Sequence, residues 1–97
     1  MQRYNKNISE GGKRVYYKIK KEKLDELREG KTNSYIAKIT KYSRQYITYI
    51  FKQRMNINSA TAIKLLMPLA KESIKLNNML KEKGIDYMID YFFEEEE

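Results

Sequence analysis

The segment from residue 44 to residue 52 carries hydrogen-bonding side chains at helical spacing. Arginine and lysine can donate to O6 and N7 of guanine, glutamine can pair twice with adenine, and a threonine methyl group can pack against that of thymine. At 100° per residue, the face opposite the apolar residues Ile47, Ile50 and Phe51 holds Gln45, Tyr49 and Lys52, with Thr48 on its edge, and Arg44 lies in the first turn. We therefore expect these residues to contact DNA bases: Arg44, Gln45, Thr48, Tyr49 and Lys52.

The charges along the chain are strongly sorted. The 97 residues carry a net charge of +7, but residues 1–81 hold 19 basic and 6 acidic side chains, whereas residues 82–97 hold 1 basic and 7 acidic ones. No acid occurs between Glu29 and Glu72. Such a surface attracts a polyanion through long-range steering and counterion release. The sorting favours a nucleic acid or an anionic membrane as partner, and a solvated lysine-rich face is the alternative.

The chain contains no cysteine and no histidine. Disulfides, thiolate nucleophiles and the common zinc ligand sets are therefore excluded. Asp86 and Asp90 are paired carboxylates near apolar surface, but without an imidazole or thiol beside them they favour a solvated face over catalysis. We expect no enzyme activity, no metal and no cofactor. No long apolar run occurs, so we expect neither a membrane span nor a secretory signal, and hence a cytoplasmic location.

The apolar spacing predicts an all-α fold, a compact bundle of about five helices. Helices are expected over about 20–29, from about 34, after a turn at 41–43, from Asn58 or Ser59, and after Gly84. Thr32, Asn33 and Ser34 form a cluster of N-cap candidates for the second of these helices, and Ser43 is the candidate for the third. Pro68 should kink or split the fourth of these around 64–68. After Pro68, the apolar spacing continues through Leu69, Ile74, Leu76 and Leu80 to Gly84. The acidic run at the chain end opposes the macrodipole of the last helix, so this end should fray.

The N-terminal segment allows two interpretations. Val15, Tyr17 and Ile19 alternate with polar residues and predict a short strand. Tyr4 and Ile8 could supply the partner strand of a hairpin. A loose basic arm that follows DNA is the alternative.

The helix from about 34, the short turn and the helix that follows form a helix-turn-helix pattern. Ala37 is the small residue where the two helices approach most closely, and Ile36 and Tyr42 close the turn. Ile47 and Ile50 then anchor the second helix to the core.

With these residues, the chain resembles the phage repressor and Cro-like (Xre-like) helix-turn-helix family over about residues 20–70. Lys41 stands where the family favours glycine, and Thr40 where a larger apolar residue is common. The resemblance implies a bundle of about five helices that acts as a dimer on a palindromic operator, with the second helix of the motif in the major groove.

The resemblance also implies contacts to the DNA backbone. It places the start of the first helix of the motif, with short polar side chains and a nearby lysine, against a phosphate. Other cations would add charge contacts, and a tyrosine could lie against sugar or phosphate. The expected backbone contacts are Lys31, Asn33, Ser34, Lys38, Lys41, Tyr46 and Arg54.

The last predicted helix has an apolar face of Ile85, Met88, Ile89 and Phe92. This face could form a dimer seam or cover the chain's own core. We therefore expect a basic arm or short hairpin at 1–19, a helix-turn-helix DNA-binding domain at 20–84, and a C-terminal helix with an acidic tail at 85–97.

Together these features predict a sequence-specific regulator of transcription that binds double-stranded DNA. The resemblance implies a phage or mobile-element repressor of the Cro-like type, acting as a homodimer that occludes a promoter in the cytoplasm of a bacterial or phage-infected cell. One alternative is a protein-interaction module, antitoxin-like or an inhibitor, that uses its tyrosine-rich surface and the last helix. Another is the DNA-recognising component of a phage packaging machine, and the structural alternative is a small helical bundle whose apolar residues are only core.

Overall fold

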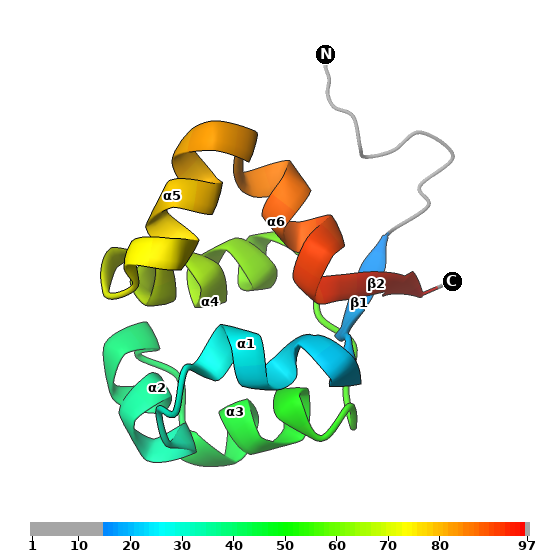
Figure 1. The fold of residues 1–97 in the computed structure, drawn as a ribbon. Helices are drawn as coiled ribbons and strands as arrows, with labels where there is room; N and C mark the ends of the chain where they lie inside the picture. The colour runs from blue at the N-terminus through cyan, green and yellow to red at the C-terminus, as the bar shows by residue number, and fades with distance from the viewer. Residues whose placement is uncertain (1–14, 97) are drawn as a thin grey trace.

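A computed structural model describes residues 15–96 as two groups of helices with a small sheet at one end (Figure 1). The described range contains six α-helices rather than about five, so the predicted all-α class holds as a mostly helical fold with a two-stranded antiparallel sheet. None of these helices is long and apolar enough to cross a membrane. The elements in chain order are β1 (Tyr16–Ile19), the 3-10 helix η2 (Lys21–Lys23), α1 (Leu24–Arg28), α2 (Asn33–Thr40), α3 (Arg44–Phe51), α4 (Ser59–Lys71), α5 (Ile74–Lys83), α6 (Ile85–Phe92) and β2 (Phe93–Glu96).

Short polar side chains begin four of the helices. Thr32, Ser43, Asn58 and Ser73 each accept a hydrogen bond from the backbone N–H three residues later, at the start of α2, α3, α4 and α5. The helix starts predicted near Thr32, Ser43 and Asn58 are confirmed. The cap at Ser73 was not predicted, because the apolar spacing after Pro68 runs on to Gly84 and indicates no helix start at this position.

The turn between α2 and α3 depends on the backbone of Lys41. Its φ of 70° lies in the left-handed region, and its N–H donates to the carbonyl of Ala37 at 2.9 Å. This is the conformation that glycine adopts at low cost. The turn therefore has a left-handed residue even though a lysine occupies the position.

One core joins all the described elements except η2. Its fully buried side chains include Ile19 of β1, Leu27 of α1, Ile36 of α2, Ile47 of α3 and Phe92 of α6. The strand and the last helix therefore share the core of the helices at 20–84 instead of standing apart from it.

The predicted break at Pro68 is wrong in its position. Helix α4 runs through Pro68, and the chain leaves it only at Glu72 and Ser73. Pro68 removes one hydrogen bond to the carbonyl of the exposed Lys64, where water can replace the donor, while buried leucines hold the helix on both sides. The break also leaves Ile74, expected on an apolar face, 84% exposed at the start of α5.

The partner of the predicted strand is the C-terminus. β2 pairs antiparallel with β1, with Lys18 opposite Glu94 and Ile19 opposite Phe93. The expectation of a fraying acidic helix end is therefore wrong for Glu94–Glu96, which pair in the sheet. The hairpin partner suggested at Tyr4 and Ile8, and the basic arm that precedes residue 15, lie outside the described residues.

The apolar face of α6 covers the chain's own core. Met88, Ile89 and Phe92 are buried, and Ile85 is half-buried against the same cluster. Of the two roles considered for this face, the structure shows the intramolecular one. A dimer seam made from the three buried side chains would require them to leave the core.

A polar cluster ties α1 to the two helices that follow α4. The Glu26 carboxylate pairs with Lys75 Nζ of α5 at 2.6 Å and accepts hydrogen bonds from the Tyr91 hydroxyl of α6 at 2.9 and 3.0 Å. The bond from Lys75, with help from Tyr91, lowers the pKa of Glu26, and the same contact raises the pKa of Lys75. The cluster therefore stabilises the fold only while Glu26 is ionised and Lys75 is protonated.

Replacing Lys41 by glycine should stabilise the protein. The left-handed backbone costs a lysine about 1–2 kcal/mol, and the greater freedom of glycine in the unfolded chain offsets part of this, so we expect a net gain of roughly 0.5–1 kcal/mol. Urea unfolding measures the change. The control is Lys38→Gly inside α2, which should lose roughly 0.5–1 kcal/mol, and a K41G protein that is less stable than the unchanged one would contradict the role given to this turn.

Replacing Glu26 by glutamine should lower the thermal midpoint in a pH-dependent way. Because the pKa of Glu26 is lowered in the folded protein, the contact contributes its full stability above about pH 4.5, the ordinary value of a glutamate. This stability disappears as the pH falls through the lowered pKa of the folded protein. Because the pKa of Lys75 is raised, the contribution persists up to the ordinary lysine value of 10.5. We expect a loss of about 2–5 °C at pH 7 and a much smaller one near pH 3. Calorimetry at pH 7 and pH 3 measures the thermal midpoints, and the control is the Glu82→Gln variant, because Glu82 is exposed. An equal loss of thermal midpoint at both pH values would exclude the ionised contact as the cause of that loss.

Candidate nucleic-acid interface

The start of α2 and the first two turns of α3 face a common open hollow of about 650 Å³. Five of its lining residues are among those predicted from the sequence to contact DNA bases or the DNA backbone. None of the lining side chains is acidic, and two are arginines. The lining consists of Arg28, Thr32, Asn33, Ser34, Arg44, Gln45 and Thr48.

The outer face of α3 is polar and accessible. Arg44, Gln45 and Tyr49 are exposed, while Ile47 and Ile50 on the other side of the helix are buried. Gln45 Nε2 donates to the Tyr49 hydroxyl at 2.9 Å, one helical turn away. This bond aligns the two side chains along the helix, and Gln45 must release it to use both its amide groups on one base.

Thr48 is placed differently from its neighbours on α3. It is half-buried, and its hydroxyl donates to the Arg44 carbonyl at 2.9 Å and accepts from Asn33 Nδ2 at 3.2 Å. Because the Thr48 hydroxyl is engaged by these two bonds, the base contact predicted for this residue would fall to its methyl group. Asn33 joins the start of α2 to α3, and its Oδ1 is buried without a hydrogen-bond partner. Asn33 therefore positions the two helices relative to each other.

The remaining predicted residues lie outside the lining of the hollow. Lys52 is the C-cap residue of α3, and Lys38, Lys41 and Arg54 are exposed. Lys31 is half-buried, with its ammonium group 3.6 Å from the Glu29 carboxylate. Tyr46 is half-buried, and its ring centroid lies 4.8 Å from that of Tyr42, so this tyrosine packs against the core.

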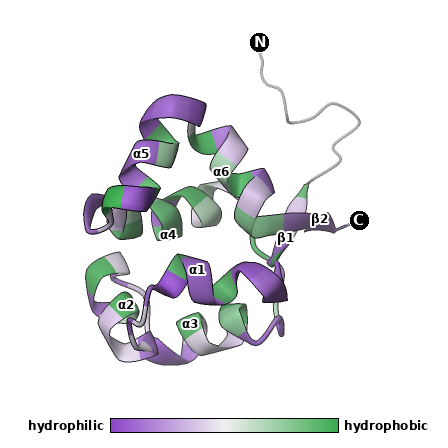
Figure 2. Cartoon of the chain, in the orientation of Figure 1, coloured by the Kyte–Doolittle hydropathy of each residue, from purple (hydrophilic) through white to green (hydrophobic). Residues whose placement is uncertain are grey.

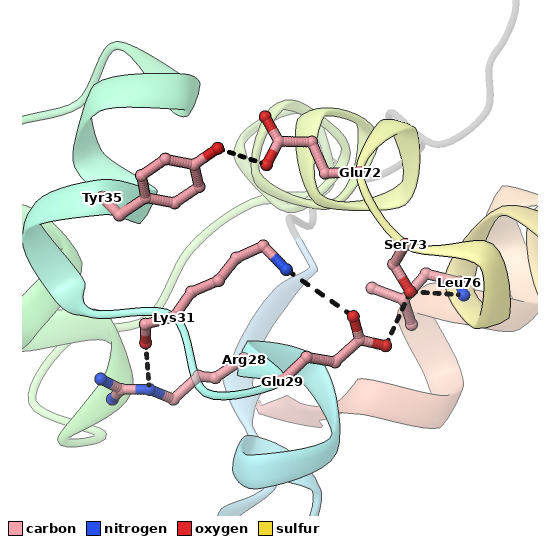
Figure 3. A network of polar contacts seen from close by, with 7 residues as sticks. All are labelled: Arg28, Glu29, Lys31, Tyr35, Glu72, Ser73 and Leu76. Carbon is pink, nitrogen blue, oxygen red and sulfur yellow. Dashed lines mark hydrogen bonds and ion pairs between the residues drawn. The ribbon is translucent and has the colours of Figure 1, made fainter.

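The acids that border the cationic stretch are both engaged within the chain. Glu29 accepts a hydrogen bond from Ser73, and Glu72 accepts one from the Tyr35 hydroxyl at 2.6 Å, which raises the pKa of Tyr35 (Figure 3). Figure 2 shows hydrophilic residues in the turn between α2 and α3 and at the start of α3. The hollow therefore has hydrophilic surroundings, and the nearest acids in the sequence are tied to other helices.

Sequence reasoning missed Arg28 as a site residue. Thr32 was expected only as a helix cap, and it both caps α2 and lines the hollow. Arg28 ends the preceding helix α1, which carries no motif signal. Arg28 reaches the hollow through tertiary structure, where its guanidinium lies over the Phe51 ring of α3, so local spacing could not indicate it.

Comparison with protein-family models, with curated proteins and with solved structures finds no match to this chain.

The bond between Asn33 and Thr48 should appear as energetic coupling. We expect the Asn33→Ala and Thr48→Val changes to cost about 1 kcal/mol less together than the sum of their separate costs, because either change alone breaks the same contact. Urea unfolding of the two single variants and the double variant measures this. The exposed pair Gln45→Ala and Tyr49→Phe is the control, with expected coupling below about 0.5 kcal/mol; additive costs for Asn33 and Thr48 would contradict the positioning role.

Proposed function

We propose that the protein binds double-stranded DNA, with α3 in the major groove and the start of α2 against a phosphate. The observation that carries this proposal is the hollow between α2 and α3, which gathers two arginines and several hydrogen-bonding side chains without any acid. A polyanion meets only favourable charge there. The positive end of the α2 dipole at the same place adds to that preference.

Duplex DNA fits this surface better than an anion of undefined shape. A single helix fits the major groove, and the exposed face of α3 offers Arg44 for guanine and Gln45 for adenine. The half-buried Thr48 offers its methyl group to thymine. The exposed cations Lys38, Lys41, Lys52 and Arg54 extend from the same two helices and the segments that follow them. These groups supply base readout and backbone attraction, which sequence-specific binding requires together.

The proposal extends to regulation of transcription by occupancy of a promoter, as a repressor of the phage or mobile-element type. In this proposal two copies bind a palindromic operator, each placing its α3 in one half-site. The face of Met88, Ile89 and Phe92 is buried within one chain. The dimer therefore uses another surface, which leaves the core intact.

Selection of bound sequences from a random DNA library tests the proposal. The unchanged protein should enrich a palindrome whose half-sites are separated by about one helical turn. The Arg44→Ala and Gln45→Ala double variant should lose this preference by about 30-fold or more while keeping its fold, because each of the two base contacts contributes about 1–3 kcal/mol of discrimination. Binding is measured by fluorescence anisotropy and folding by circular dichroism.

The matched control removes a cation and an amide from α5. Asn78 and Lys81 are both exposed, and the Asn78→Ala and Lys81→Ala double variant should bind the selected sequence as the unchanged protein does. An equal loss of binding to the selected sequence in both double variants would indicate a general charge effect. No enrichment of any sequence by the unchanged protein would refute sequence-specific binding.

A further inference from the structure

Arg28 is the one charged residue in the lining of the hollow that belongs to α1. It is half-buried, yet no carboxylate lies within ion-pair distance of it in the described part of the chain. A half-buried guanidinium keeps its charge, so it gains from an anion that enters the hollow. The other arginine of the lining, Arg44, lies on α3.

Two contacts hold the Arg28 side chain in place. Its Nε–H donates to the Lys31 carbonyl at 3.2 Å, and its guanidinium carbon lies 5.4 Å from the centre of the Phe51 ring. A guanidinium has five N–H donors in a planar fork, and this arrangement engages one of them. The terminal N–H groups are therefore available in a side chain that is already ordered.

The turn that follows Arg28 is anchored to the junction of α4 and α5 through Glu29. Ser73, only 5% exposed, donates to Glu29 Oε2 at 2.7 Å and also caps α5 through Leu76. The other Glu29 oxygen pairs with Lys31 (Figure 3). This network joins the segment before α2 to a distant part of the core.

Lys31 and Arg28 point in different directions in this network. In Figure 3 the Lys31 ammonium group extends toward Glu29, whereas the Arg28 guanidinium extends the other way from the loop. The Lys31 side chain is only 17% exposed, and its charge is balanced by the Glu29 carboxylate. A phosphate in the hollow would meet the charge of Arg28 in full and that of Lys31 only in part.

The geometry points to Arg28, rather than Lys31, as the residue before α2 that binds a backbone phosphate of DNA. This assignment rests on the proposed function and adds to it a ligand from a third helix. Lys31 becomes a positioning residue: its carbonyl orients Arg28, and its ammonium group neutralises Glu29 next to the site. The planar fork of Arg28 can donate two hydrogen bonds to one phosphate.

The experiment compares Arg28→Gln with the matched variant Lys31→Gln, which removes the same charge three residues away. Binding to a duplex of random sequence is measured by anisotropy between 50 and 200 mM salt. One phosphate contact contributes about 0.9 to the slope of log K against log salt, so R28Q should lower the slope by about 0.9 and the affinity roughly eightfold at 0.1 M salt. The K31Q slope should change by less than half as much.

Arg28→Lys keeps the charge and separates the phosphate contact from a structural role. The R28K variant should retain the salt-dependence slope of the unchanged protein although it lacks the planar guanidinium. If R28Q fails to fold, R28K takes its place as the test. Thermal unfolding of each variant measures any loss from the Phe51 contact. A purely structural role would lower the thermal midpoint of R28Q and leave its slope unchanged.

The outcomes distinguish this assignment from the proposed function. If the unchanged protein binds DNA but R28Q has the same slope, or if K31Q loses more slope than R28Q does, the assignment is overturned. The proposed function remains standing in both cases. A lower slope in R28K than in the unchanged protein also overturns it. If the unchanged protein shows no salt-dependent binding to any duplex, the proposed function fails and the assignment fails with it.

Discussion

The left-handed backbone of Lys41 is the constraint on which the candidate interface depends. Because the chain reverses there, α2 and α3 can bury Ile36 and Ile47 in the same core. The same reversal brings the beginnings of both helices to one hollow, where Asn33 contacts Thr48. A turn without a left-handed residue would direct α3 elsewhere and separate these groups. A strained lysine at this position is therefore the cost of the geometry that gathers the polar side chains.

The charge of the interface follows from where the acids are held. The stretch from Glu29 to Glu72 contains no other acid, and these two border residues are engaged by Ser73 and Tyr35 respectively. A carboxylate that accepts hydrogen bonds inside the chain projects less of its field into solvent than a free one. The cations of α2 and α3 therefore determine the potential over the hollow, and the polar network that stabilises the loop before α2 also keeps the site positive.

The acidic end of the chain is kept at the opposite end of α3. β2 pairs with β1, and β1 is attached to the end of α3 by the bond from Gln53 Nε2 to the Ile19 carbonyl. The hollow lies at the beginning of α3, about 12 Å away along the eight residues of the helix. The sheet register places Lys18 opposite Glu94, at the start of the acidic run. The net charge of the whole chain therefore understates how positive the surface at the hollow is.

The sequence by itself determined the local features: the helical class, the polar caps at Thr32, Ser43 and Asn58, the turn at 41–43 and the polar face of α3. These features depend on contacts within about four residues, which spacing and residue type express directly. Only the tertiary structure decided the pairing of β1 with β2, the burial of α6, the continuity of α4 through Pro68 and the place of Arg28. Each of these depends on which distant surfaces cover one another, and a strand of glutamates or an arginine at a helix end carries no local signal of its partner.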